Sequence, residues 1–463
     1  MVGAVVAYIP VLRSPFWLDD YIYLSASRDL GTAHYARLVF TPWSHDPLMP
    51  FTRDFWRPLA FLYFEAARPV FGSHVLPYHL VNLGIHLASV VLVWKLAKRL
   101  DPRPSVAGTA ALVFALYPGS AQAVSWVSSV NSAGLPVMLG SWLFCLSGTR
   151  GSEPSWRLLA AAAGLLAVAL MFRETSATLL APVAFWFVLV QRRDGLRAWR
   201  TYLPLLPYAL VCAAYYVVRT KLFTEPAANS DIYGFGGHFD DHWWYYIKNA
   251  LLPFRDPVLG WRVHAQEVAG AILLASMPVM LAFRRWQLFA LTLGLVVSII
   301  PSAAAILGVG QRYFYFSTPV LAAGLGMVFA DVRAWSERRG PAWPSALAVS
   351  PEVVALVLAV GIYAVWDRNA NWVDIGPERQ QTWVDELRAE YPALPAGGTL
   401  YCVNIPLDLA VFDAANLEPT LRWYYPEVGH AVWAPEQANI PPLGPDDRVF
   451  IAGDGNLLGD SGR

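Results

Sequence analysis

Charged side chains are scarce in this chain. Only 15% of its 463 residues are Asp, Glu, Lys or Arg, whereas about 25% is usual in soluble globular proteins. The 34 basic and 34 acidic residues cancel, which gives no indication of a nucleic-acid surface or of a polybasic lipid anchor. Hydrophobic residues make up 56% of the sequence and gather in long apolar runs. This composition predicts an α-helical polytopic membrane protein.

Cysteine is also scarce. Cys145 and Cys212 lie in apolar segments and Cys402 lies near the end of the chain, so they are too few and too scattered for a disulfide framework or a thiolate metal site. The sequence also lacks any compact spacing of His and Cys that is typical of zinc. The sequence does not decide whether a divalent cation is needed, and it indicates no other cofactor.

About eleven apolar segments are predicted to enter the membrane. The first, MVGAVVAYIPVL, has only twelve residues before Arg13. At 1.5 Å per residue these span about 18 Å of a hydrocarbon core of ~30 Å. The other ten lie at about residues 76–94, 105–120, 131–147, 157–172, 175–190, 201–218, 265–283, 286–307, 313–330 and 345–366.

Arg and Lys are distributed unequally between the loops. One set of loops carries fifteen of them, between Lys95 and Arg339, while the opposite short loops hold only Arg173 and Arg312. By the positive-inside rule, the first set is cytoplasmic. The first loop (13–75), the loop 219–264 and the tail then lie outside, and we expect a multi-pass protein of a bacterial inner membrane. Residues 1–366 are predicted to form the membrane domain, and residues 367–463 a small α/β module outside it.

An acidic pair follows the first apolar segment. In FWLDDYIYL, Asp19 and Asp20 lie among aromatic residues. Ionised side chains near hydrocarbon are costly unless they line a wet cavity or meet partners, so this pair is a candidate catalytic site. The alternative is a solvated loop at the membrane interface.

The two arginines of the outer short loops form a second candidate site. Arg173 precedes Glu174 in MFRETSA, and Arg312 lies between Gln311 and Tyr313 in GQRYFYF. The fixed fork of donors in arginine matches phosphate oxygens, so both arginines are suited to bind a lipid phosphate. Gln311 and Tyr313 are candidates for the same substrate site, and Glu174 is a further candidate catalytic residue. The alternative for each is an arginine that extends to the interface without a ligand.

Further polar residues lie on the same predicted side. Arg57 precedes a proline in FWRPLAF, and His79, Asn82 and His86 form one stripe of a helix in YHLVNLGIHL. These four are candidate substrate-binding residues, although the stripe is also explained by hydrogen bonds between helices.

An aromatic segment in the loop 219–264 is a third feature. HFDDHWWYYIKNALLPF is typical of a helix that lies under the lipid head groups. Alternatively, Asp240 and Asp241, with the two neighbouring histidines, bind a divalent cation.

Six segments carry a resemblance to a known family. They occur in one order between about residues 10 and 330 and read FWLDDYIYL, FWRPL, YHLVNLGIHL, ALYPGSAQAVSWVSS, FRETSA and GQRYFYFSTP. The chain resembles the GT-C superfamily of membrane glycosyltransferases, which use polyprenyl-phosphate sugars. It is most similar to protein O-mannosyltransferases of the transmembrane type that carries tetratricopeptide repeats. The resemblance implies that Asp19, with Asp20 beside it, is the catalytic base, and that Arg312 and Tyr313 meet the lipid phosphate.

The chain also departs from this family. The family has a lysine where this chain has Arg173, which keeps the charge but not the geometry. The tail shows no self-similarity at the 34-residue period of tetratricopeptide repeats.

These residues fit one reaction. Transfer of a sugar from a lipid phosphate to a hydroxyl needs a carboxylate that takes the proton, cations that hold the leaving phosphate, and a polar and aromatic wall for the sugar. We expect an inverting glycosyltransferase with Asp19 as general base, whose partners are a polyprenyl-phosphate sugar donor, membrane lipids and a glycan, lipid or protein acceptor. The competing classes are a polytopic transporter or lipid flippase and a non-catalytic membrane scaffold. A transporter should show inverted repeats and broken helices near the midplane, whereas these charges gather at one face.

Overall fold

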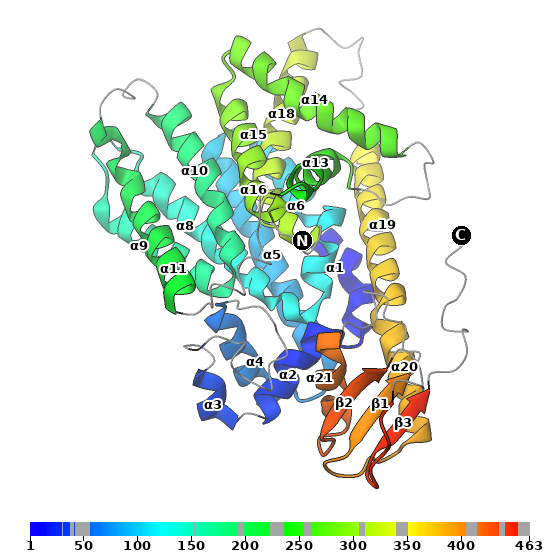
Figure 1. Cartoon of the computed structure of the whole chain (residues 1–463). Coiled ribbons are helices and arrows are strands. Elements are labelled where there is room, and N and C mark those ends of the chain that lie inside the picture. Colours follow the sequence, from blue (N-terminus) through cyan, green and yellow to red (C-terminus); the bar gives the residue numbers. More distant parts are fainter. Residues whose placement is uncertain are drawn as a thin grey trace.

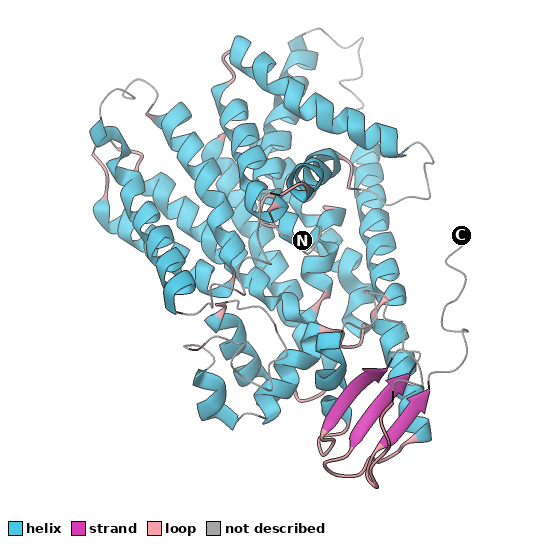
Figure 2. Ribbon diagram, viewed as in Figure 1, coloured by secondary structure: helices cyan, strands magenta, loops and turns pink. Residues whose placement is uncertain are grey.

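The chain folds into a helical bundle with a small sheet at one end (Figures 1 and 2). The computed structural model describes residues 1–29, 31–37, 41, 56–151, 153–192, 199–222, 236–253, 262–304, 311–338, 351–403, 414–434 and 440–451. The bundle contains α1 (Val2–Tyr8), η1 (Ile9–Arg13), α5 (Val75–Leu100), α6 (Pro104–Ala115), α8 (Gly134–Gly148), α9 (Trp156–Phe172), η5 (Glu174–Leu179), α10 (Leu180–Trp186), η6 (Phe187–Gln191), η8 (Trp199–Leu205), α11 (Leu206–Leu222), α14 (Arg262–Ala282), α15 (Trp286–Ser298), α16 (Ile300–Ala303), α18 (Thr318–Arg338) and α19 (Pro351–Ile375).

Six helical stretches within the described residues are long and apolar enough to cross a membrane. They are Val75–Leu100, Val127–Gly148, Glu174–Gln191, Tyr202–Lys221, His264–Ala282 and Trp286–Ala303. Val2–Arg13, Pro104–Ala115 and Trp156–Phe172 are shorter apolar helices. The protein is therefore an integral, multi-pass membrane protein, and the predicted number of eleven spans stays a prediction.

Close backbone contacts join pairs of helices within the bundle. A Cβ on Gly294 of α15 would lie 2.6 Å from the Cα of Pro182 in α10, and one on Gly326 of α18 would lie 2.6 Å from the carbonyl oxygen of Val106 in α6. Only glycine allows backbones to approach this closely. The helices that lead to and from the candidate site are thus fixed to each other.

The first loop and the C-terminal part of the chain lie at the same end of the bundle (Figure 1). The loop contributes α2 (Asp19–Asp29), α3 (Gly31–Arg37) and α4 (Pro58–Phe71). Proline is favoured at the first helical position because its missing amide hydrogen would have no partner there, which explains why α4 begins directly after Arg57. The start of α4 therefore fixes the position of Arg57.

The C-terminal part contains two helices and three strands. These are α20 (Pro377–Glu390), β1 (Thr399–Val403), α21 (Ala414–Tyr424), β2 (His430–Ala434) and β3 (Arg448–Ile451), and the sheet is parallel with the order β2-β1-β3. Trp383, Leu387, Cys402 and Phe450 form part of their shared core. Since α19 continues to Ile375, the domain boundary expected at residue 367 falls inside a helix.

Several short helices connect these parts close to the candidate site. They are η3 (Pro118–Ser120), α7 (Ala121–Ser125), η4 (Val127–Ala133), α13 (His238–Leu251) and α17 (Gln311–Phe314).

Candidate functional site

The two neighbouring aspartates have different surroundings. The side chain of Asp20 is buried, with 1% of its surface exposed. Its Oδ2 accepts a hydrogen bond from the amide of Trp17 at 2.9 Å, and its Oδ1 accepts one from the amide of Ser128 at 2.6 Å. Asp20 thus joins the start of α2 to the segment before α8. Asp19 is only partly buried, so of the two it is the one that a substrate can reach.

Asp19 lies near the charges of two other segments, Arg57 and the pair Arg173–Glu174. Tyr23, one turn further along α2, is buried, and burial raises its pKa to about 12. Four charged groups act on this hydroxyl and shift its pKa in opposite directions, and they belong to Arg57, Asp19, Glu174 and Arg173. The first-loop acid and the FRET segment, more than 150 residues apart in the sequence, are therefore neighbours in space.

A bidentate ion pair joins the first loop to the bundle. Arg57 donates from Nε to Glu174 Oε2 at 2.9 Å and from Nη2 to Oε1 at 2.5 Å. About a tenth of each side chain is exposed. Removal of one partner from such a buried pair leaves an uncompensated charge, which costs roughly 3–5 kcal/mol. Glu174 is thus held as the partner of Arg57, and a catalytic role for it stays a prediction.

Arg173 and Arg312 lie against aromatic rings at this end of the bundle. The guanidinium of Arg173 is 5.0 Å from the centroid of the Tyr313 ring, and that of Arg312 is 5.2 Å from the same ring. Burial lowers the pKa of Arg173 to about 10, and the positive charges of Arg57 and Arg312 act in the same direction. Arg173 therefore stays charged at neutral pH, and three arginines converge. Such a concentration of positive charge favours an anion.

Trp126 connects this cluster to the acidic helix. The Arg312 guanidinium lies 4.4 Å from the centroid of the Trp126 ring, a cation–π contact. Trp126 donates from Nε1 to the carbonyl oxygen of Trp17 at 3.0 Å, and the two tryptophan rings are 5.3 Å apart. Gln122 accepts a hydrogen bond from the amide of Arg312 at 3.2 Å. Gln122 was not singled out from the sequence.

The polar stripe of α5 bonds to neighbouring backbone. His79 Nε2 lies 2.9 Å from the carbonyl oxygen of Ser14, and Asn82 donates to the carbonyl oxygen of Trp126 at 2.6 Å. His86 is fully buried, and its ring nitrogens contact the Tyr315 hydroxyl at 3.0 Å and the Ala115 carbonyl oxygen at 3.2 Å. These bonds agree with the alternative that the stripe joins helices, and a role in substrate binding stays a prediction.

Residues near the C-terminus contact the start of α2, the helix that begins at Asp19. The sequence did not indicate these contacts. Leu18, directly before Asp19, has φ +48°, a conformation that costs free energy for a residue with a side chain. Its amide donates to Oε1 of the buried Gln380 at 3.2 Å, and the Tyr21 and Tyr424 hydroxyls are 2.9 Å apart. Gly376 lies under Trp17, where a Cβ would be 2.5 Å from the indole ring. These contacts stabilise the turn at Leu18, which determines the position of Asp19.

The remaining candidates are less well placed. Asp240 and Asp241 are exposed in the first turn of α13, and the described residues contain no group of three or more His, Cys, Asp or Glu that could hold a metal ion. A cation at Asp240 and Asp241 stays a prediction. Gln311 begins α17, and its side chain lies outside the described residues.

Known proteins resemble part of this chain in sequence. The family model described as dolichyl-phosphate-mannose-protein mannosyltransferase matches residues 57–218. Protein O-mannosyl-transferase Tmtc1 of Drosophila melanogaster is 31% identical over 180 residues, which are 38% of this chain and 21% of that protein. Protein O-mannosyl-transferase TMTC2 of Mus musculus is 27% identical over 203 residues, or 40% and 23% of the two chains. The chain thus spans about a fifth of the length of these curated relatives.

A solved structure resembles nearly the whole chain in fold. The crystal structure of ArnT from Cupriavidus metallidurans, bound to undecaprenyl phosphate, superimposes with a TM-score of 0.50 and 14% identity, over 91% of this chain and 83% of that one. This similarity shows the ArnT-type fold. Together with the mannosyltransferase family model, it confirms the predicted resemblance to GT-C membrane glycosyltransferases.

The environment of Asp20 predicts a pH dependence of stability. Burial raises the pKa of Asp20 from 3.8 to about 8, although the Trp17 and Ser128 amides act in the opposite direction. The folded state therefore keeps the proton where the unfolded chain has released it. The stability that this proton contributes is complete below about pH 4 and is lost as the pH rises to about 8.

We compare the melting temperature of the wild type with that of Asp20→Asn. The difference, wild type minus variant, should decrease as the pH is raised from about 5 to about 8, because only the wild type has this carboxyl. Thermal unfolding of both purified proteins in detergent measures the difference, and titrations common to both cancel. A difference that is constant or that grows with pH would show that Asp20 is ionised throughout.

Proposed function

We propose that the protein is an inverting membrane glycosyltransferase that moves a sugar from a polyprenyl-phosphate donor to a hydroxyl acceptor. The observation that carries this proposal is the convergence of Arg57, Arg173 and Arg312 near the partly buried Asp19. One group that takes a proton and several that hold a phosphate are what this reaction requires. The mannosyltransferase family model and the ArnT-type fold support the same class.

In the proposed reaction, Asp19 accepts the proton of the acceptor hydroxyl. The hydroxyl oxygen attacks the anomeric carbon, a new glycosidic bond forms, and the bond from that carbon to the phosphate oxygen breaks. The electron pair leaves with the polyprenyl phosphate, so no strong general acid is needed. A single displacement inverts the configuration at the anomeric carbon through an oxocarbenium-like transition state.

The arginines have separate roles in this proposal. Arg312 and Arg173 bind the phosphate, because each lies against Tyr313 and has a fork of donors that fits two phosphate oxygens. Arg57 is the partner of Glu174, which makes it a positioning residue that adds positive charge to the site. Trp126 connects the two parts of the site, because its ring contacts the Arg312 guanidinium and its Nε1 donates a hydrogen bond to the Trp17 carbonyl oxygen.

The sidedness and the donor are part of the proposal. Arg and Lys gather in the loops at the other ends of the helices, which supports a site on the extracytoplasmic face of a bacterial inner membrane. The C-terminal module contacts α2 and is then also outside. The undecaprenyl phosphate bound by ArnT supports a polyprenyl-phosphate donor, and the acceptor is a glycan, a lipid or a protein.

Replacement of the two aspartates separates catalysis from structure. We expect Asp19→Asn to abolish transfer with little change in unfolding temperature, because the amide keeps the shape and loses the basicity. Asp20→Asn, the matched control, should keep measurable transfer and change stability, since Asp20 bonds two backbone amides. Transfer of labelled sugar from a synthetic polyprenyl-phosphate donor measures the first effect. Near-normal turnover by folded Asp19→Asn would remove Asp19 from the role of base.

Arg312→Lys tests the phosphate contact. The substitution keeps the charge and loses the bidentate geometry, so we expect activity to fall about ten- to hundred-fold, in line with ~1.5–3 kcal/mol for a charged hydrogen bond. The loss should be the same for every sugar carried on one lipid, because the contact is to phosphate. Arg28→Lys is the control, since Arg28 also lies against a tryptophan, 5.6 Å from the Trp423 ring. A loss that depends on the sugar, or an equal loss in the control, contradicts the assignment.

A further inference from the structure

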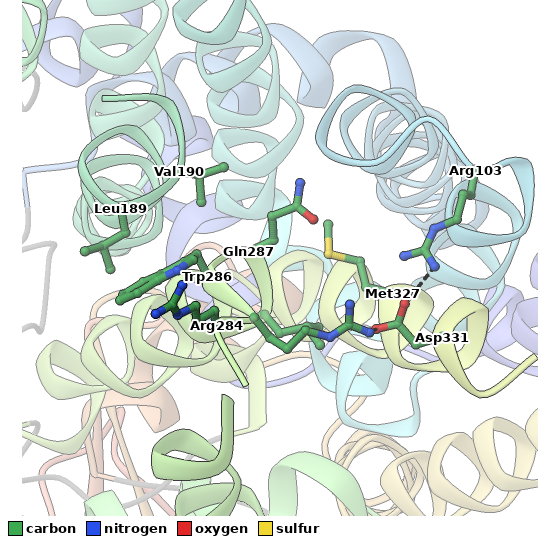
Figure 3. Close-up of a pocket in the computed structure, with 10 residues that line it drawn as sticks. Arg103, Leu189, Val190, Arg284, Trp286, Gln287, Met327 and Asp331 are labelled. Carbon is green, nitrogen blue, oxygen red and sulfur yellow. Dashed lines mark hydrogen bonds and ion pairs between the residues drawn. The ribbon is translucent and has the colours of Figure 1, made fainter. Parts of the chain in front are cut away.

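A polar cavity lies at the end of the bundle away from the proposed catalytic site, and Figure 3 shows the residues that line it. Its volume is about 320 Å³, and it opens where α6 begins, where η6 ends, at the turn between α14 and α15, and along the last turns of α18. Helix α15 is 13 residues long and runs from the cavity at Trp286 toward the arginine cluster, a rise of roughly 20 Å. The cavity is therefore separate from the proposed catalytic site.

Positive charge dominates the lining. Arg103, Arg284 and Arg285 line the cavity, against the single carboxylate of Asp331. Asp331 accepts from Arg103 Nη1 at 2.7 Å and also pairs with Arg285, so it holds these two guanidinium groups in place. Asp101 also binds Arg103, through Nη2 at 2.6 Å.

Arg284 is the arginine of this group that we expect to bind a ligand. Among the described residues, no carboxylate forms an ion pair with it, and it lies at φ +54° in the turn between α14 and α15. A non-glycine residue in this conformation is strained, so the surrounding fold determines the turn. Figure 3 shows Arg284 and Trp286 on one side of the cavity, and Arg103 bonded to Asp331 on the other.

Apart from Gln287 and the indole of Trp286, the rest of the lining is aliphatic or a thioether. Four side chains from three different elements supply it: Leu189, Val190, Leu288 and Met327. A site with arginines on one part of its wall and aliphatic side chains on another fits a ligand that has an anionic head and a hydrocarbon tail. All three arginines belong to the loops that the positive-inside rule assigns to the cytoplasm, where anionic lipids are attracted to basic pockets between helices.

We infer that this cavity binds the phosphodiester head group of an anionic phospholipid in the cytoplasmic leaflet. Free phosphate offers the same oxygen atoms to the arginines but has no acyl chain to lie on the aliphatic residues. The proposed sugar transfer does not depend on this site, because the two lie at opposite ends of the helices.

The test is a lipid titration of the purified full-length protein in detergent. The titrants are phosphatidylglycerol, phosphatidylcholine and inorganic phosphate, and native mass spectrometry counts the molecules bound. We expect one phosphatidylglycerol to bind saturably, with phosphatidylcholine and inorganic phosphate at least ten-fold weaker. Arg284→Gln should weaken phosphatidylglycerol binding about ten-fold, and Arg157→Gln, at an exposed arginine of the same predicted face, should leave it unchanged.

A second variant keeps the test valid if Arg284→Gln misfolds. Gln287→Glu adds a negative charge to the lining and leaves its ion pairs in place. Because the added charge repels an anionic head group, this variant should also weaken phosphatidylglycerol binding. Equal binding of the two lipids, equal losses in Arg284→Gln and Arg157→Gln, or inorganic phosphate bound as tightly as phosphatidylglycerol would overturn the inference.

Discussion

Arg57 and Glu174 bury a bidentate charge pair where the first loop meets the helical bundle, and the other charged residues of the site are arranged around it. Each of the two ions would be costly at this depth without its partner. The pair therefore fixes the start of α4 relative to η5. Arg173, adjacent to Glu174 in the chain, is then held next to Tyr313, and Asp19 faces the same group of charges.

Positive charge remains after this pairing. Glu174 neutralises one of the three convergent arginines, and the partly buried Asp19 acts on the same Tyr23 hydroxyl as Arg57 and Arg173. The guanidinium groups of Arg173 and Arg312 both lie against aromatic rings, Arg173 5.0 Å from the Tyr313 centroid and Arg312 4.4 Å from the Trp126 centroid. The proposed phosphate-binding arginines and the candidate base thus belong to one group of charges, at the end of the bundle opposite the arginine-lined cavity.

Hydropathy and loop charge were sufficient to predict one common side of the membrane for these residues, and that sidedness stays a prediction. They were not sufficient to separate Asp19 from Asp20. Adjacent residues of a helix differ in direction by about 100°, and which one is buried depends on Ser128, a residue over a hundred positions away. The bond from Leu18 to Gln380 joins positions 362 residues apart and has no local signal in the sequence. Arg103, Arg284 and Arg285 served only as markers of orientation in the sequence, since their common cavity exists only once α6, α15 and α18 are packed.

Sugar transfer requires that the protein break the bond between a sugar and its lipid phosphate, and the fate of a label in sealed liposomes shows whether it does. Purified protein is reconstituted with a polyprenyl-phosphate donor labelled in the sugar and with candidate acceptors. We expect the label to leave the lipid and to appear on the acceptor, with an equal amount of free polyprenyl phosphate. Label that stays on the lipid and only changes leaflet would show a transporter and rule out a transferase.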